Sequence, residues 1–341
     1  MHKNVNKNLF AKVNTIILRN FHDYWKDPIV NKYFQDDASE KFEGFLILKK
    51  GKKPLFIAHP FNYAQVKKEY KKINCCTYTS QEEIKNILKK TLGKKVGYNA
   101  PFYSAHALKN LKKLLGAKTK IIDVSEELGK SREIKNEKEI ELISKAANET
   151  EKVILEARSW LYSGMTEKEL EIRIKRKFEK DGFETGFCIV SFEENTANIH
   201  HCAGQKKLEQ GFVLIDAGAK YKGYCSDVTR TYYYPKETRE FAIVEINVKE
   251  CMHEIEKKLK DGTKAKELIK IVKKYKLSMP HSLGHGVGIE VHDYPLGINE
   301  KSKTVLKEGM VVAIEPATYT EKFGYRYENT YLITKNGAKK L

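Results

Sequence analysis

The 341-residue sequence lacks three features that mark common classes of protein. No apolar run approaches the roughly 18 residues of a membrane-spanning helix, so no membrane partner is expected. The N-terminal segment MHKNVNKNLFAKVN lacks the apolar core of a secretory signal, which favours a cytoplasmic location. The six cysteines are scattered without C-x-x-C spacing, which indicates free thiols rather than a disulfide framework.

Acidic residues are also scarce relative to basic ones. The sequence has 63 Lys and Arg against 45 Asp and Glu, a formal net charge of +18. A clustered basic face would indicate phosphate binding. The lysines instead come in pairs spread over the chain, from Lys49-Lys50 to Lys339-Lys340, so we expect a solvated surface and no nucleic-acid partner.

The length predicts two domains, with the boundary in the polar segment 125–135. We place the domains at residues 1–130 and 131–341. In the first, residues 42–58 predict a β-hairpin that turns at Gly51. Helices and short strands should follow it, at 80–92, 95–98, 103–116 and 120–124. The first domain is therefore predicted to be a smaller α/β unit.

The second domain begins with a predicted amphipathic helix from Asn136 that ends before Gly164. A capping box of Thr166 and Glu169 opens another helix that reaches about Lys180. Seven identities then share one offset of 98 residues, among them Gly164 with Gly262, Leu208 with Leu306 and Gly211 with Gly309. A shared offset indicates a duplicated half-domain, and hence an α+β domain with pseudo-twofold halves.

In each predicted half, a Leu-x-x-Gly turn leads into an apolar strand that runs into a carboxylate. Val213–Ile215 precedes Asp216, and Val311–Ile314 precedes Glu315. An acid at the end of an apolar strand is costly to bury unless it is paired or binds a metal. Two such acids in duplicated halves predict one shared site near the pseudo-twofold axis.

Further acids and a histidine-rich segment extend this site. Asp227 lies in the strand-like run 224–231, and Glu328 lies between β-forming residues in 326–331. Between them, the segment 281–293 places His281, His285 and His292 among glycines, where the backbone can approach a substrate closely. Four carboxylates and one imidazole suit a pair of hard or borderline divalent ions, which generate hydroxide and polarise a carbonyl.

These motifs resemble those of a known family. The strings HSLGHGVGIEVH, DAG, SDVTRT, EP and GYRYEN are similar to those of the pita-bread metallopeptidases, in particular the prolidases and Xaa-Pro aminopeptidases. The resemblance covers nearly the entire chain. It implies a C-terminal pita-bread domain, of the creatinase and aminopeptidase type, preceded by a creatinase-like N-terminal domain.

The resemblance also implies the metal ligands. Asp216 would chelate one metal ion, Asp227 and Glu328 would bridge two, and His285 with Glu315 would complete the second. Glu315 would also act as general base or proton shuttle. The expected metals are manganese or cobalt, with zinc or iron as alternatives.

Further residues match substrate-binding positions of the family. His200 and His292 would contact the substrate and stabilise the tetrahedral intermediate, and His281 is a further pocket histidine. The doublet His200-His201 leaves two choices, of which we favour His200. Arg326 would orient the bridging carboxylate and reach a substrate carboxylate.

Two departures from the family pattern bear on specificity. Asn329 stands where an Asp often follows the last Glu, and residues 27–33 replace a run that many relatives share. The expected reaction is hydrolysis of the bond between an N-terminal residue and a following proline, in dipeptides or in longer peptides. A methionine aminopeptidase and a non-enzymatic binding protein of the same fold are the alternatives. Relatives are often dimers, so a homodimer is also expected.

Overall fold

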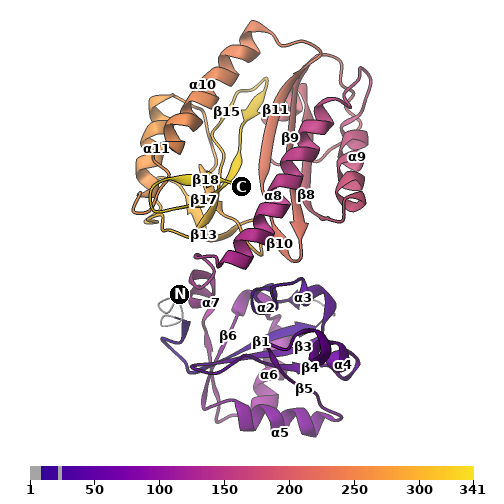
Figure 1. Cartoon of the computed structure of the whole chain (residues 1–341), viewed down its shortest axis with the longest axis vertical. Coiled ribbons are helices and arrows are strands. Elements are labelled where there is room, and N and C mark those ends of the chain that lie inside the picture. The colour runs from indigo at the N-terminus through magenta and orange to yellow at the C-terminus, as the bar shows by residue number, and fades with distance from the viewer. Residues whose placement is uncertain (1–8, 22–24) are drawn as a thin grey trace. The chain divides into compact units, whose positions relative to one another are not determined.

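The computed structural model describes residues 9–21 and 25–341, which form two compact units, Met1–Arg132 and Glu133–Leu341 (Figure 1). Residues 1–8 of the segment searched for a secretory signal lie outside the described residues. Every helix in the described ranges is too short or too polar to cross a membrane.

The first unit is built on a seven-stranded mixed sheet of order β5-β4-β3-β1-β6-β7, with β2 paired to β1. Its strands are β1 (Thr15–Phe21), β2 (Trp25–Lys26), β3 (Gly44–Lys49), β4 (Leu55–Ala58), β5 (Asn74–Cys76), β6 (Lys95–Tyr98) and β7 (Lys120–Asp123). The predicted hairpin is confirmed, because β3 and β4 pair antiparallel with Ile47 opposite Leu55.

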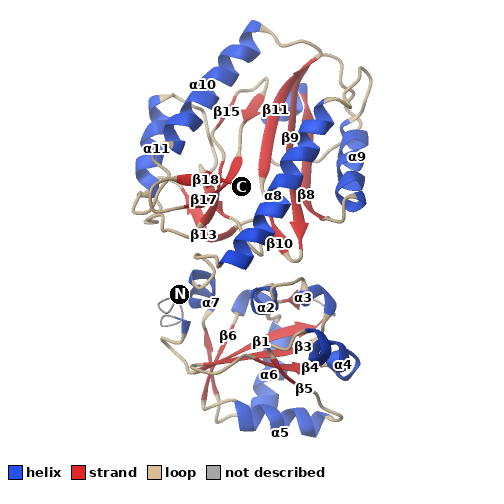
Figure 2. Cartoon of the chain, in the orientation of Figure 1, coloured by secondary structure: helices blue, strands red, loops and turns tan. Residues whose placement is uncertain are grey.

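Helices accompany this sheet (Figure 2), and the two that the sequence pattern predicts, at 80–92 and 103–116, are among them. They are α2 (Ile29–Phe34), α3 (Ala38–Lys41), α4 (Pro60–Glu69), α5 (Gln81–Thr91), η1 (Ala100–Phe102), α6 (Ala105–Leu115) and α7 (Ser125–Lys130). Leu88 of α5 and Leu111 of α6 pack with Ile17 and Ile57 of the sheet in one core. The segment 125–135, predicted as a polar linker, instead begins with α7, because Leu128 has a buried position to fill.

The second unit contains two larger sheets with helices against each. Its first half comprises α8 (Glu137–Arg158), α9 (Glu167–Lys180), β8 (Glu184–Phe192), η2 (Glu193–Ala197), β9 (Gly211–Tyr221), β10 (Tyr224–Cys225) and β11 (Val228–Tyr234). Strand β9 lies between β8 and β11 and also pairs with β10. Ile154 of α8 and Ile174 of α9 pack on Ile215 of β9, which confirms the two predicted helices and their apolar faces.

The second half repeats this arrangement. It comprises α10 (Arg239–Glu256), α11 (Ala265–Lys274), β12 (Gly284–Gly286), β13 (Asp293–Ile298), β14 (Val311–Ile314), β15 (Ala317–Tyr319), β16 (Gly324–Arg326), β17 (Asn329–Ile333) and β18 (Ala338–Lys340). Its sheet has the order β13-β12-β14-β17-β18, while β15 and β16 form a separate pair. Met252 of α10 and Leu268 of α11 pack on Val312 of β14.

Hydrogen bonds at the same offset of 98 confirm the predicted duplication. The Gly164 amide donates to the Leu208 carbonyl at 2.8 Å, and the Gly262 amide donates to the Leu306 carbonyl at 2.9 Å. Both glycines have a left-handed backbone, with φ of +90° and +84°, which glycine adopts without a steric penalty. The two halves therefore share backbone detail as well as sequence.

The strands near the predicted acids differ from the sequence prediction. Strand β9 continues through Asp216 to Tyr221 instead of ending at the acid. Asp227 lies in a two-residue break between β10 and β11, and Glu328 lies in a similar break between β16 and β17. Regular strand pairing is therefore interrupted at two of the acidic positions.

The capping box of α9 provides a test of how the first half is stabilised. Thr166 Oγ1 accepts a hydrogen bond from the Glu169 amide at 3.1 Å, and Glu169 Oε2 accepts one from the Thr166 amide at 2.7 Å. We expect Thr166→Ala to lower the free energy of unfolding by about 1 kcal/mol in urea titrations. Thr166→Ser keeps the hydroxyl and should retain most of the stability. Equal losses in both variants would instead assign the effect to the methyl group.

Candidate metal centre

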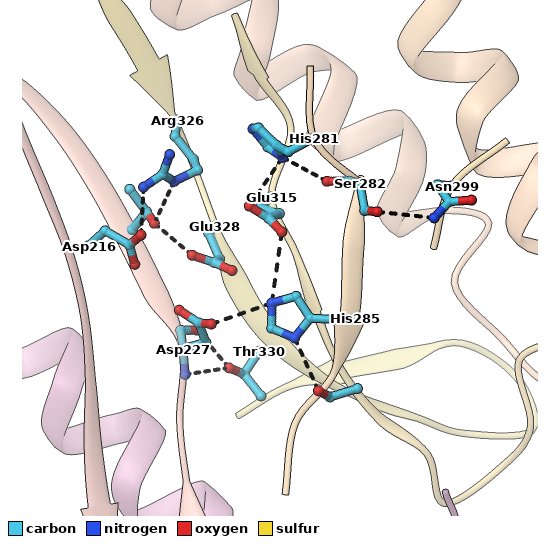
Figure 3. Close-up of polar contacts among 12 residues, drawn as sticks. Asp216, Asp227, His281, Ser282, His285, Asn299, Glu315, Arg326, Glu328 and Thr330 are labelled. Atoms are coloured by element: carbon cyan, nitrogen blue, oxygen red, sulfur yellow. Dashed lines mark hydrogen bonds and ion pairs between the residues drawn. The ribbon is translucent and has the colours of Figure 1, made fainter. Parts of the chain in front are cut away.

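Four carboxylates and one imidazole converge from both halves of the second unit (Figure 3). Asp216 lies on β9, and Asp227 and Glu328 lie in the two strand breaks. His285 lies on β12, and Glu315 directly follows β14. The possible ligand atoms of Asp216, Asp227 and Glu328 lie within 4.8 Å of one another, and so do those of His285, Glu315 and Glu328.

The position of His285 depends on the close approach of two strands. Gly284 on β12 pairs with Ile314 on β14, and a Cβ atom built on Gly284 would lie 2.0 Å from the carbonyl oxygen of the preceding Ala313. Only glycine fits at that distance. The glycine-rich segment therefore serves strand packing beside the site as well as substrate access.

Burial and mutual repulsion make the carboxylates of Asp227 and Glu328 unfavourable as anions. Burial, and then the charges of Glu328 and Asp216, raise the pKa of Asp227 well above its usual value. Burial and Asp216 raise the pKa of Glu328 to about 7. Asp216 Oδ1 is buried and has no hydrogen-bond partner among the described residues. A divalent cation would satisfy this oxygen and neutralise the cluster, so the donor set fits a metal site.

The tautomer of His285 also fits a metal ligand. Nδ1 lies 3.1 Å from the Gly286 carbonyl oxygen, which can only accept, so Nδ1 carries the hydrogen. Nε2 therefore presents its lone pair, 3.5 Å from Asp227 Oδ2 and 3.8 Å from Glu315 Oε1. Burial and the neighbouring His292 lower the pKa of His285 to about 4, which keeps the ring neutral. A neutral imidazole whose other nitrogen is hydrogen-bonded is the usual form of a metal ligand.

Arg326 is buried beside the acids but pairs differently from the prediction. It was expected to orient the bridging carboxylate, whereas Nη2 donates to Asp216 Oδ2 at 2.5 Å. Nε donates to Thr229 Oγ1 at 3.2 Å, and Thr229 Oγ1 donates to Glu328 Oε2 at 2.6 Å. Arg326 thus reaches Glu328 only through Thr229. The guanidinium can satisfy Asp216 directly because β16, which carries it, lies close to β9.

A further set of side chains holds the backbone of the acidic positions, and the sequence analysis missed it. Arg230 donates to the Thr229 carbonyl at 2.8 Å and to the Glu328 carbonyl at 2.5 Å. It also donates to Asn329 Oδ1 at 2.8 Å. Asn329, which stands where relatives often have an Asp, therefore accepts a hydrogen bond from a buried arginine. Thr330 Oγ1 donates to the Asp227 carbonyl at 2.7 Å. These residues belong to the sequence strings SDVTRT and YENT, so their position beside Asp227 and Glu328 in the motifs was the signal that could have identified them.

The predicted histidines surround a cavity of about 590 Å³ that the acids also line. His200 and His292 line it as exposed side chains. His281 is largely buried, and burial lowers the pKa of His281 to about 4. Its Nδ1 donates to the Ser282 carbonyl at 2.7 Å, so its Nε2 is the acceptor. Five apolar residues form one part of the wall, namely Phe187, Ile189, Ile199, Val291 and Leu296. Ser282, Gly284 and Glu290 also line the cavity.

His201 does not line this cavity and pairs with the buried Glu167 instead. His201 Nε2 lies 2.8 Å from Glu167 Oε2, which also accepts from the Gly204 amide at 3.0 Å. Glu167 Oε1 accepts from the Phe192 amide at 2.9 Å. The carboxylate thus holds both ends of the segment that carries His200. Sequence reasoning missed Glu167 because it lies in the first turn of α9, where an acid is ordinary.

Family models match both units. Residues 141–335 match the metallopeptidase family M24, and residues 32–134 match the creatinase/prolidase N-terminal domain. The chain is 36% identical over 329 residues to the Xaa-Pro dipeptidase of Pyrococcus furiosus, covering 92% of this chain and 90% of that protein. It is 34% identical over 333 residues to the Xaa-Pro dipeptidase of Pyrococcus horikoshii, covering 93% of this chain and 90% of that protein.

Solved structures with similar folds cover almost the entire chain. The X-Pro aminopeptidase of Thermotoga maritima has a TM-score of 0.87 at 26% identity, covering 96% of this chain and 94% of that one. The prolidase of Pyrococcus furiosus has a TM-score of 0.82 at 30% identity, covering 96% of this chain and 95% of that one. The predicted pita-bread domain with a creatinase-like N-terminal domain is thereby confirmed.

Removing one charge from the cluster should separate metal binding from stability. We expect Asp227→Asn to bind no manganese, and to be at least as stable as the wild type without metal because repulsion is relieved. At manganese concentrations about 100 times the dissociation constant, the wild type should gain about 2.7 kcal/mol of stability. The variant should gain none.

Thermal unfolding with and without manganese, together with metal analysis, measures both effects. Glu209→Gln removes an exposed carboxylate remote from the site and should respond to manganese as the wild type does. An Asp227→Asn protein that kept its metal would contradict the ligand assignment.

Proposed function

This chain belongs to the metallopeptidase family M24, in its prolidase and Xaa-Pro peptidase branch, and from that membership we propose that it hydrolyses the bond between an N-terminal residue and a following proline. The observation that carries the proposal is the buried carboxylate cluster beside an apolar cavity wall, in a chain with a creatinase/prolidase N-terminal domain. A proline ring is apolar and its nitrogen carries no hydrogen, so its pocket needs an apolar wall and no acceptor for an amide.

We propose that two divalent ions are held by five residues, namely Asp216, Asp227, His285, Glu315 and Glu328. Such ions supply a Lewis acid for the scissile carbonyl and lower the pKa of water. Manganese or cobalt suits this oxygen-rich set, with zinc or iron as alternatives. A cytoplasmic location and a homodimer stay predictions from the sequence and the resemblance.

Glu315 is the proposed general base and proton shuttle. Burial, and then the charge of Glu328, raise the pKa of Glu315 well above its usual value, which favours uptake of a proton by this carboxylate. Its two oxygens lie 3.5 Å from His281 Nδ1 and 3.8 Å from His285 Nε2. The group therefore faces both the ligand cluster and the cavity.

The cavity histidines would bind the substrate. His200 and His292 are proposed to donate hydrogen bonds to the carbonyl oxygen as negative charge develops on it. His281 would accept a hydrogen bond through Nε2. Arg326 is proposed to hold Asp216 in its binding orientation, since the guanidinium already donates to that carboxylate.

The two adjacent histidines provide the first functional test. We expect His200→Ala to lower kcat about 100-fold with metal content unchanged, because one donor to a developing oxyanion is lost. His201→Ala should act through the position of His200, with a smaller loss, and His201→Gln should restore activity by donating to Glu167. Steady-state kinetics and metal analysis distinguish the two sites. A larger loss in His201→Ala than in His200→Ala would reverse the assignment.

Substrate length provides the second test. Metal-stripped enzyme should regain activity with manganese or cobalt on Ala-Pro or on Ala-Pro-Ala, measured by proline release and by mass spectrometry. Cleavage of the dipeptide alone would identify a dipeptidase, and preference for the tripeptide an aminopeptidase. Metal-bound enzyme that ignores both peptides but cleaves Met-Ala would replace the proposal with a methionine aminopeptidase.

A further inference from the structure

The net charge is concentrated in the first unit. Residues 1–132 contain 27 Lys and Arg against 12 Asp and Glu, a net charge of +15. Residues 133–341 contain 36 against 33, a net charge of +3. The basic residues are spread over both units, as predicted, but the acidic residues are scarce in the first unit, so the positive net charge is not shared between the units. From Ile84 to Ile122 the chain has ten lysines and no acidic residue.

The lysines of the first unit recur in four connecting segments, each with four lysines. The segments are KKGKK at 49–53, KKEYKK at 67–72, KKTLGKK at 89–95 and KKLLGAKTK at 112–120. All sixteen lysine side chains are exposed. Within the described part of the chain, none of the sixteen forms an ion pair. Glu69 is the one acidic residue in the four segments.

The topology brings the four segments to one edge of the sheet. Strands β1, β6 and β7 are parallel, and so are β4 and β5, so each set of strands begins at a common edge. Thr15 at the start of β1 lies opposite Lys49 at the end of β3, and Ile47 lies opposite Leu55 at the start of β4. Both sets therefore share one edge, which we call the lysine edge. Helices α4, α5 and α6 also end at this edge, and a short connection joins each of them to the start of β5, β6 or β7, respectively.

Helix ends explain only part of this pattern. Lysines in the last turns of α4, α5 and α6 interact favourably with the helix dipoles. The other ten lysines lie at strand ends or in turns, where no dipole requires them. Six strands about 4.8 Å apart make an edge roughly 24 Å long, which matches roughly seven phosphates of one nucleic-acid strand at about 3.4 Å each.

A cavity lies beside the same edge. It has a volume of about 320 Å³ and is lined by the aromatic side chains of Phe10 and Tyr33, by Leu9 and Leu48, and by the lysine segment 49–52. A positively charged track with aromatic side chains beside it is the arrangement that binds single-stranded nucleic acid, because bases stack on the rings while lysines contact phosphates.

We propose that the lysine edge binds the phosphate backbone of a single-stranded nucleic acid, with one base in the cavity at Phe10 and Tyr33. Protein interfaces are depleted of lysine, which disfavours an acidic protein partner. A membrane surface would also call for exposed apolar side chains. Among the described residues of this unit, Phe61 is the one large exposed hydrophobic residue, and it lies at the start of α4, away from the edge.

The test compares two full-length variants with equal changes in charge. One replaces Lys94, Lys95, Lys118 and Lys120 by Gln, and the control replaces Lys257, Lys258, Lys301 and Lys303 of the second unit by Gln. Fluorescence anisotropy measures binding of a labelled 20-nucleotide RNA and of DNA with the same sequence at several salt concentrations. The first variant should reduce the slope of log K against log salt by up to about 3, and the control should leave it unchanged.

Further measurements test base stacking and the other possible ligands of the lysine edge. Phe10→Ala should weaken single-strand binding by about tenfold without changing the salt slope, since stacking does not release counterions. Unchanged thermal unfolding shows that each variant is folded. Equal weakening in both lysine variants would overturn the proposal in favour of diffuse attraction. Binding of anionic lipid vesicles, polyglutamate or duplex DNA as tight as that of the single strands would overturn it as well.

Discussion

Mutual repulsion among buried carboxylates is the constraint on which the second unit depends. Burial and the charges of neighbouring acids raise the pKa values of Asp227, Glu315 and Glu328, so these carboxylates are unfavourable as anions without a compensating cation. Arg326 offsets one charge at Asp216, and the remaining charge is what divalent ions would offset. Metal binding and folding are therefore linked in this unit, since the ligands are distributed over both of its halves.

Duplication explains how one fold assembles such a site. Each half supplies a helix pair, a left-handed glycine turn and a strand that carries an acid or leads directly into one. Because the halves meet strand to strand, Asp216 and Glu315 reach the same centre from opposite sides. The two halves differ in the segments that carry the histidines of the site. Only the second half supplies the glycine-rich strand of His285, and only the first supplies the segment of His200.

Local patterns were sufficient for the elements and motifs that depend on nearby residues. The α9 capping box and the 42–58 hairpin follow from short-range spacing, and the repeat at an offset of 98 follows from comparing the sequence with itself; the structure contains each of them. Contacts between residues far apart in the chain could not be predicted from the sequence. Arg326 contacts Asp216 across 110 positions, and Glu167 holds His201 across 34. The lysine edge was missed for the same reason, because four separated segments become neighbours only through the order of the strands.

The two proposed activities rest on different parts of the fold. The ligand cluster lies on strands, at a strand end and in strand breaks, where the side chains are largely buried, so substitution there is expected to affect metal binding and turnover together. The sixteen lysines lie in surface connections, at strand ends and in the last turns of three helices, and their side chains are exposed, so substitutions there leave the core unchanged. A polyanion held there would determine where the peptidase is retained without altering its chemistry. Such separation allows the charge of the first unit to change while the carboxylate cluster stays the same.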